Sequence, residues 1–201
     1  MSRDFSTAGD VMVQASTRYI TQAEFEQLCL DQPDPMMERT AQGELINVSP
    51  VGGEGGSREA DLIGDVIIWN RQAQLGKVFS SQSAFKLPFG STRAADVAWV
   101  RQDRWDALTP EQRIGFPPIC PDFVIELRSQ SLSDGKLKPQ SLAELRTKMT
   151  EYVASGLRLG WLINPPDQQV EIYRQGQAVQ VVAMPTLLSG EDVLSGFELQ
   201  V

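Results

Sequence analysis

The chain has 201 residues, no histidine and a formal net charge of −8 at pH 7, from 18 Lys and Arg against 26 Asp and Glu. The lack of histidine excludes Ser-His-Asp and Cys-His catalysis and imidazole-based zinc sites, so enzymatic chemistry must come from carboxylates, lysine, hydroxyls or a bound metal. The acidic balance argues against a surface that coats nucleic acid broadly, but it is compatible with a locally basic cleft.

Length and composition predict one compact domain over residues 18–201, preceded by a polar, loosely held arm over residues 1–17. No stretch approaches the roughly 20 apolar residues of a membrane span, and the N-terminus lacks the apolar core of a signal peptide. We therefore expect a cytoplasmic protein with no membrane partner. Cys29 and Cys120 lie far apart and outside any C-x-x-C pair, which predicts two buried free thiols.

The first half of the domain predicts a helix, a hairpin and a second helix. Thr21 and Glu24 have the capping-box spacing ahead of an apolar pattern, so a short helix should begin there. Short strands are expected over 37–40 and 44–48, joined by a glycine-containing turn. The segment "VGGEGG" lacks the P-loop spacing and predicts a flexible loop, after which apolar residues at the helical period predict a helix over 57–75.

The second half predicts further strands around one long helix. In chain order we expect strands in "KVFSSQSAFKLP" and "STRAADVAWV", a surface connection with about one helical turn, a strand in "DFVIELRS", a polar loop in "SQSLSDGKLKPQ", a helix in "SLAELRTKMTEYVASG", a strand in "LGWLINP", and a hairpin turning at Gln175–Gly176. The passage from Phe123 to Ile163 predicts a right-handed crossover and a parallel strand pair in a mixed sheet.

Two carboxylates interrupt apolar strands. Asp96 stands within "STRAADVAWV" and Glu126 within "DFVIELRS". Burial of an isolated carboxylate is costly unless a cation or hydrogen bonds compensate it. Neighbouring strands would bring both groups to the same patch of the sheet, where they repel each other unless a cation lies between them. Oxygen ligands alone favour magnesium, manganese or calcium over zinc.

A hard cation held by one or two carboxylates orients water against a phosphodiester and stabilises the developing charge. A lysine often completes such a site, but two residues after Glu126 the chain has Arg128. Its guanidinium can bind a phosphate but does not deprotonate in proteins. Lys148 is the alternative, because it borders the apolar stripe of its predicted helix and its ammonium could reach toward the sheet.

The segments "RAADVAWV", "PDFVIELRS", "KMTEYVASGLRLGWLINP" and "LSGEDVLSGFEL" follow one another in this order. Through them the chain resembles the Uma-type restriction endonuclease family, a branch of the PD-(D/E)XK nuclease superfamily, over about residues 20–200. The resemblance implies an α/β, restriction endonuclease-like fold, with a mixed central β-sheet flanked by helices and, in this chain, extra N-terminal and C-terminal hairpins.

The resemblance also implies a site. Asp96 and Glu126 match the metal-binding acids, and Lys148, in the K-x-x-x-Y pattern, matches an active-site lysine that has moved from the strand to the following helix. Glu38 matches an acidic position ahead of the Gly-Glu-Leu turn. Many relatives place a histidine where this chain reads "GGEGG", so the chain departs from the family pattern at that position.

The leading hypothesis is therefore a metal-dependent endonuclease that hydrolyses DNA phosphodiester bonds. Mg²⁺ or Mn²⁺ would bind Asp96 and Glu126, with Glu38 contributing directly or through water, while Lys148 orients the attacking water. Arg93 and Arg128 would contact substrate phosphates, although arginines beside carboxylates are more commonly structural ion pairs.

Two alternatives stay open at this stage. Glu59 falls on the inward side of its predicted helix, so it could replace or join Glu38. The fold could also serve as a noncatalytic module for binding or interaction, with a homodimer as one form. The four tryptophans are interpreted as core or rim packing, because a base-stacking platform would require them on one exposed face.

Overall fold

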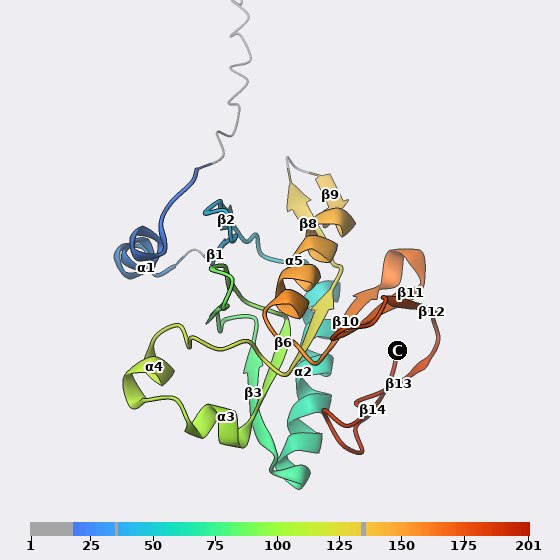
Figure 1. The fold of residues 1–201 in the computed structure, drawn as a ribbon. Helices are drawn as coiled ribbons and strands as arrows, with labels where there is room; N and C mark the ends of the chain where they lie inside the picture. The colour runs from blue at the N-terminus through green and yellow to red at the C-terminus, as the bar shows by residue number, and fades with distance from the viewer. Residues whose placement is uncertain (1–17, 35, 134–135) are drawn as a thin grey trace, which may run out of the picture.

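The computed structural model describes residues 18–34, 36–133 and 136–201 (Figure 1). The predicted arm over residues 1–17 lies outside the described residues. The helices are α1 (Gln22–Asp31), α2 (Gly53–Ala73), α3 (Gln102–Asp106), α4 (Pro110–Ile114) and α5 (Leu142–Ala154), with a 3-10 helix at Pro165–Asp167. The strands are β1 (Met37–Arg39), β2 (Leu45–Asn47), β3 (Gly76–Ser80), β4 (Phe85–Lys86), β5 (Thr92–Arg93), β6 (Val97–Arg101), β7 (Phe123–Leu127), β8 (Gln130–Ser133), β9 (Lys136–Pro139), β10 (Leu159–Asn164), β11 (Gln169–Arg174), β12 (Gln180–Ala183), β13 (Leu187–Ser189) and β14 (Glu198–Gln200).

A six-stranded mixed sheet organises the described part of the chain, with the strand order β12-β11-β10-β7-β6-β3. Strands β7 and β10 are parallel, and the other neighbours in this sheet are antiparallel. Helix α5 forms the connection between the parallel strands, because parallel neighbours need a crossover. A smaller antiparallel sheet has the order β2-β1-β5-β4. The predicted mixed sheet and parallel pair are confirmed, and so are the predicted hairpins, β1–β2 near the N-terminus and β11–β12 at Gln175–Gly176.

Helices α2 and α5 cover opposite faces of the large sheet (Figure 1). Leu62 and Val66 of α2 pack in one apolar core with Trp99 and Trp161, whereas Met149 of α5 packs in the other. Strand β7 contributes residues to both cores, because its side chains alternate between the two faces of the sheet, as the sequence predicts. Its odd-numbered residues face α2, and its even-numbered ones face α5.

The predicted strand over 91–100 is interrupted in the structure. Thr92–Arg93 belongs to the small sheet and Val97–Arg101 to the large one, and Ala94–Asp96 crosses between them. The prediction of one continuous strand was therefore wrong: Asp96 lies at a bend just before β6. In this crossing, residues 94–96 are not part of a strand in either sheet. The Asp96 side chain is therefore free to extend toward the neighbouring strand β7.

Three segments predicted as loops have regular structure. Gly53–Gly56 of the glycine-rich segment form the first turn of α2, where small residues allow close packing: a Cβ at Gly55 would lie 3.1 Å from the Cβ of Ser129. The segment predicted as a polar loop forms the β8–β9 hairpin. The connection after β6 contains two short helices, and α4 begins with a capping box from Thr109 to Gln112.

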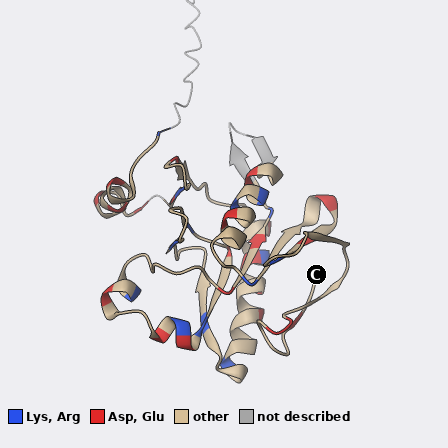
Figure 2. Cartoon of the chain, in the orientation of Figure 1, with Lys and Arg blue, Asp and Glu red and all other residues tan. Residues whose placement is uncertain are grey.

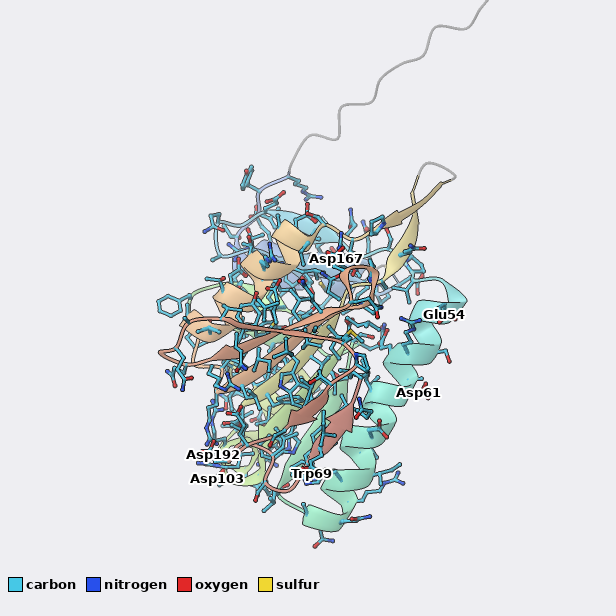
Figure 3. The ribbon with its side chains drawn as sticks, turned by 90° about the vertical axis from the view of Figure 1, so that its right-hand side faces the viewer. Glu54, Asp61, Trp69, Asp103, Asp167 and Asp192 are labelled. Carbon is cyan, nitrogen blue, oxygen red and sulfur yellow. The ribbon has the colours of Figure 1, made fainter. Side chains whose placement is uncertain are left out.

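The remaining sequence expectations concern packing. Trp99 and Trp161 are buried, as predicted, and Trp69 of α2 donates from its Nε1 to the Ser195 carbonyl at 3.1 Å, near the C-terminal hairpin (Figure 3). Cys29 and Cys120 are both free, as predicted, but Cys29 is only partly buried. Among the described residues, no helix is both long and apolar enough to cross a membrane.

Charged side chains of both signs alternate over the outer helices. Figure 2 shows Lys and Arg interspersed with Asp and Glu along α3 and α4. Several of these charges pair locally, as in the contact of 2.7 Å from Arg101 Nη2 to Asp103 Oδ2. Exposed pairs of this kind contribute little to stability.

Candidate active site

Strand register brings Asp96 beside Glu126. Val97 of β6 pairs with Ile125 of β7 in the antiparallel direction, so the residue before Val97 comes opposite the residue after Ile125. The Asp96 Oδ2 accepts a hydrogen bond of 2.6 Å from the Leu127 backbone N–H. The two carboxylates that interrupt the apolar segments therefore lie at one place on the sheet.

Lys148 extends from α5 to the same place. Its Nζ lies 2.8 Å from Glu126 Oε1 and 2.8 Å from Glu38 Oε1, and it donates to the Ala94 carbonyl at 2.6 Å. The helix is anchored by Leu145, Met149 and Tyr152, which are buried on the face that meets the sheet. The ammonium of Lys148 thus bridges carboxylates from two different sheets.

Glu38 reaches the site from β1 in the small sheet. Because Arg39 pairs with Thr92, Glu38 and Arg93 come opposite each other in register. Its Oε2 accepts from Arg93 Nη1 at 2.9 Å, and its Oε1 accepts from the Ala94 backbone N–H at 3.1 Å. Only 4% of Glu38 is exposed, so these contacts take the place of hydrogen bonds to water.

Burial and neighbouring charges shift the ionisation of all four groups. Burial raises the pKa of Asp96 to about 6, and it raises the pKa of Glu126 to about 8, with the negative charges of Asp96 and Glu38 adding to the shift and Lys148 opposing it. For Glu38, burial opposes ionisation, but the charges of Lys148 and Arg93 outweigh it and lower the pKa. The three acids raise the pKa of Lys148 despite its burial.

Glu59 also approaches this site, from α2 on the opposite face of the sheet. Its Oε1 accepts from the Ser81 hydroxyl at 2.6 Å, and its negative charge contributes to the raised pKa of Asp96. The negative charges of Glu38 and Glu59 therefore both act on Asp96, although the two residues come from different elements.

A scan against protein-family models places this chain in a known family. The model of the Uma2 family, described as "Putative restriction endonuclease", matches residues 22–201, which is nearly the whole sequence. The chain belongs to the Uma2 family.

A solved structure has the same fold as this Uma2 chain. It is described as "a putative nuclease belonging to DUF820" from Anabaena variabilis ATCC 29413, and it aligns with a TM-score of 0.70 over 90% of this chain and 94% of that one. The two sequences are 21% identical, a level at which the likeness establishes the fold alone. No curated protein matches the chain.

The two arginines predicted to contact substrate are both held by other side chains in this Uma2 chain. Arg93 is 3% exposed, and its Nε donates to Glu151 at 2.7 Å in addition to the contact with Glu38. The Nη1 of Arg128 lies 3.0 Å from Asp167 Oδ2 and 3.2 Å from Asn164 Oδ1. Arg93 is buried together with its partners, whereas the side chain of Arg128 is 14% exposed beside half-exposed Asp167.

Sequence reasoning missed two residues of the site. Glu151, three positions after Lys148, binds Arg93 and so connects α5 to the small sheet. The hydroxyl of Tyr152 is buried without a hydrogen-bond partner among the described residues, and the charges of Glu126 and Glu38 contribute to its raised pKa. The helical spacing from Lys148 could have indicated both, because residues three and four positions apart share one face.

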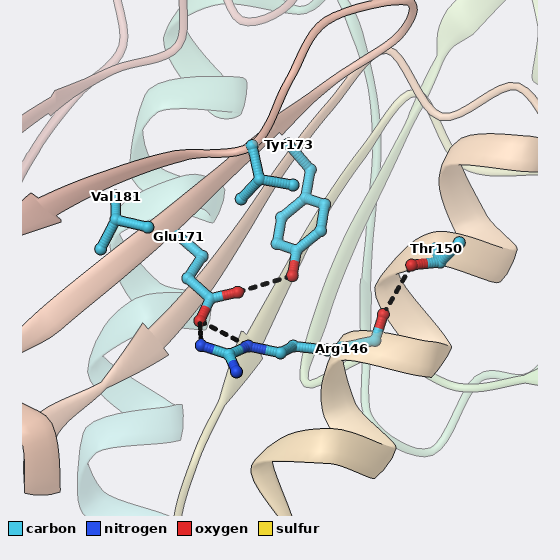
Figure 4. Close-up of a pocket in the computed structure, with 6 residues that line it drawn as sticks. Arg146, Thr150, Glu171, Tyr173 and Val181 are labelled. Atoms are coloured by element: carbon cyan, nitrogen blue, oxygen red, sulfur yellow. Dashed lines mark hydrogen bonds and ion pairs between the residues drawn. The ribbon is translucent and has the colours of Figure 1, made fainter.

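A hollow lies between α5, at Arg146 and Thr150, and strands β11 and β12 (Figure 4). It has a volume of about 410 Å³, and its lining includes Arg146, Glu171 and Tyr173. Arg146 Nε and Nη2 donate to Glu171 Oε1 at 2.9 and 2.6 Å, and the Tyr173 hydroxyl donates to Glu171 Oε2 at 2.7 Å. Both oxygens of this buried carboxylate are occupied, and the hollow includes none of the four predicted catalytic residues.

The donor set of the site fits a hard divalent cation. Within the residues that the structure describes, no group of three or more His, Cys, Asp or Glu is arranged to hold a metal by itself. Magnesium does not require such a cage, because it is commonly bound through one or two carboxylates and keeps several waters. Asp96 and Glu126 offer two such carboxylates, and burial is the main reason that the pKa of each is raised.

Proposed function

We propose that this Uma2 chain is a metal-dependent endonuclease that hydrolyses phosphodiester bonds in DNA. The observation that carries the proposal is the convergence of Asp96, Glu126 and Glu38 on the ammonium of Lys148, with Nζ 2.8 Å from two of the carboxylates. A buried lysine beside acids of raised pKa is an arrangement found at catalytic centres more often than in structural ion pairs at the surface.

The residues that would hold Mg²⁺ or Mn²⁺ are Asp96 and Glu126, with Glu38 directly or through water. When bound, the cation supplies Lewis-acid polarisation of the phosphate and lowers the pKa of a coordinated water. Asp96 is fixed for this role by the Leu127 N–H, which orients one carboxylate oxygen and leaves the other available.

Lys148 supplies positive charge at the reacting phosphate and orients the attacking water. Its raised pKa keeps it protonated at neutral pH, so it acts as a hydrogen-bond donor and a charge stabiliser and does not remove the proton from water. Arg128, at the end of β7, is the candidate for contact with an adjacent phosphate, provided that it exchanges Asp167 for the substrate.

The test is cleavage of supercoiled, linear and branched DNA by the purified chain with Mg²⁺ or Mn²⁺. Asp96→Ala and Lys148→Ala should each reduce cleavage by about a hundredfold or more, since loss of a ligand or of a charge stabiliser has this effect. Arg146→Met is the matched control. Arg146 lies on the same helix as Lys148 and binds a different buried carboxylate, that of Glu171. Equal cleavage by all variants would assign the activity to a contaminant and reject the proposal.

A noncatalytic module is the second candidate, and one observation favours it. Lys148 and Arg93 both pair with Glu38, so two side-chain cations of the chain itself compensate this buried acid. Calorimetry with Mn²⁺ separates the two candidates: heat that depends on Asp96 and Glu126 supports the nuclease, and its absence supports the module. The cytoplasmic location and the homodimer stay predictions from the sequence.

A further inference from the structure

Arg93 belongs to a buried chain of five charged side chains, in which it connects Glu151 to Glu38. The order of contacts is Glu151, Arg93, Glu38, Lys148 and Glu126, with separations of 2.7, 2.9, 2.8 and 2.8 Å between successive charged atoms. The members come from both sheets and from α5. The side chains of Arg93 and Glu38 are 4% and 5% exposed, so water does not screen their contact.

The contacts of Glu38 determine where Lys148 lies. Arg93 takes Oε2 of Glu38, which leaves Oε1 for Lys148 and for the Ala94 N–H. Lys148 in turn donates to the Ala94 carbonyl, so the peptide groups on both sides of Ala94 contact this pair. Without Arg93, Lys148 would be the sole cation beside a buried Glu38, and their attraction would draw its ammonium away from Glu126.

We propose that Arg93 is a positioning residue, which holds Glu38 between two cations and thereby keeps Lys148 within reach of Glu126. Glu151 orients Arg93 from the far side by accepting from its Nε. The planar guanidinium suits this task, because its donors bind two carboxylates in fixed directions, whereas a lysine would present one ammonium. This inference rests on the proposed nuclease function and replaces the expected phosphate contact of Arg93.

Kinetics with DNA distinguish positioning from phosphate contact. If Arg93 acts through Glu38 and Lys148, Arg93→Met should lower kcat by about tenfold or more and leave KM within about twofold, as expected for a residue that supports the reacting groups. If Arg93 instead contacts a phosphate, Arg93→Met should raise KM. It should also reduce the slope of log affinity against log salt concentration by about one, the amount for one phosphate contact. That result, or a kcat equal to that of the wild type, would overturn the proposal.

A double-mutant cycle tests the route through Glu38. In a Glu38→Gln background, adding Arg93→Met should lower kcat by less than about twofold relative to Glu38→Gln alone. The carboxylate that Arg93 orients is already absent in that background. Full additivity of the two losses would contradict the proposal. Arg93→Lys retains a buried cation and should give an intermediate kcat. Arg146→Met, which breaks a comparable pair with Glu171, should leave kcat unchanged.

A second readout does not depend on DNA cleavage. Acylation of Lys148 by an amine-reactive ester, measured by mass spectrometry relative to exposed Lys77, should change at least about twofold in Arg93→Met and Glu151→Gln, because the contact of Lys148 with Glu126 is altered. Lys86, which pairs with Glu26, should not change in the same samples, so general unfolding is detected separately. If the wild type does not cleave DNA but Lys148 labelling changes in these variants, the nuclease function fails and the positioning role stands. Unchanged Lys148 labelling in folded variants refutes the positioning role alone.

Discussion

Glu126→Gln should make the metal-free protein more stable at alkaline pH. Glu126 is 2% exposed, and burial together with the charges of Asp96 and Glu38 raises its pKa to about 8. In the unfolded chain this carboxyl ionises near its ordinary value of 4.5, so between these two pH values the folded state binds the extra proton. The stability that this proton provides is fully present below the pKa of the unfolded state, and it is lost as the pH rises through the pKa of the folded state. Glutamine is neutral at every pH and avoids the loss.

The expected magnitude follows from the gap between the two pKa values. At about 1.36 kcal/mol per pH unit, the interval from 4.5 to about 8 corresponds to about 5 kcal/mol. The advantage of the variant over the wild type should therefore grow between pH 5 and pH 8 and level off above pH 8. Lys148 still pairs with Glu38 in the variant, so the ammonium is not left without a carboxylate.

The assay is urea unfolding with EDTA at several pH values from 5 to 9. Glu54→Gln is the matched control, because Glu54 is exposed on α2 and pairs with Arg58 (Figure 3). Its effect on the free energy of unfolding should stay within about 0.5 kcal/mol, as for most surface substitutions. A difference between Glu126→Gln and the wild type that is flat from pH 5 to pH 8 would refute the reasoning.

Four further predictions concern metal binding and packing. Calorimetry in buffers of different ionisation enthalpy should show Mn²⁺ affinity rising from pH 6 to pH 8 with release of a proton, because Glu126 must ionise to bind; a pH-independent affinity would contradict this. Gly76→Ala should lower the free energy of unfolding by about 1–3 kcal/mol, because its Cβ would lie 2.3 Å from the backbone oxygen of Val100. Gly64→Ala, in an open helical position, should raise it by up to about 1 kcal/mol, and a loss there would count against the packing argument. In the same urea assay, Trp161→Ala should cost about 3–5 kcal/mol, because the indole is fully buried, and a loss below about 1 kcal/mol would show that the core had closed around the gap.

Local patterns were sufficient for the elements that carry the site. The alternation in "DFVIELRS" placed Glu126 on one face of β7, and the helical period placed Lys148 at the border of the apolar stripe of α5. Capping residues located the start of α1 and of α5. These predictions succeeded because period and capping depend on a few neighbouring residues.

The prediction for Asp96 failed in its local detail but not in its placement near Glu126. Small apolar residues on both sides of Asp96 gave no signal that the chain leaves one sheet and enters the other. The glycine-rich start of α2 was missed for a similar reason, because glycine disfavours a helix locally, and the close approach of Ser129 to Gly55 depends on the tertiary fold.

The sequence by itself determined which side chains are chemically able to form this site. It excludes histidine chemistry, places carboxylates inside apolar segments and puts one lysine on the inner face of a helix. Only the tertiary structure decided that Glu38 and Lys148, 110 positions apart, meet at 2.8 Å, and that Arg93 lies between two acids. The physical reason is that periodicity gives the direction of a side chain within its own element, whereas a distance between elements depends on strand register and on the packing of α5 against the sheet.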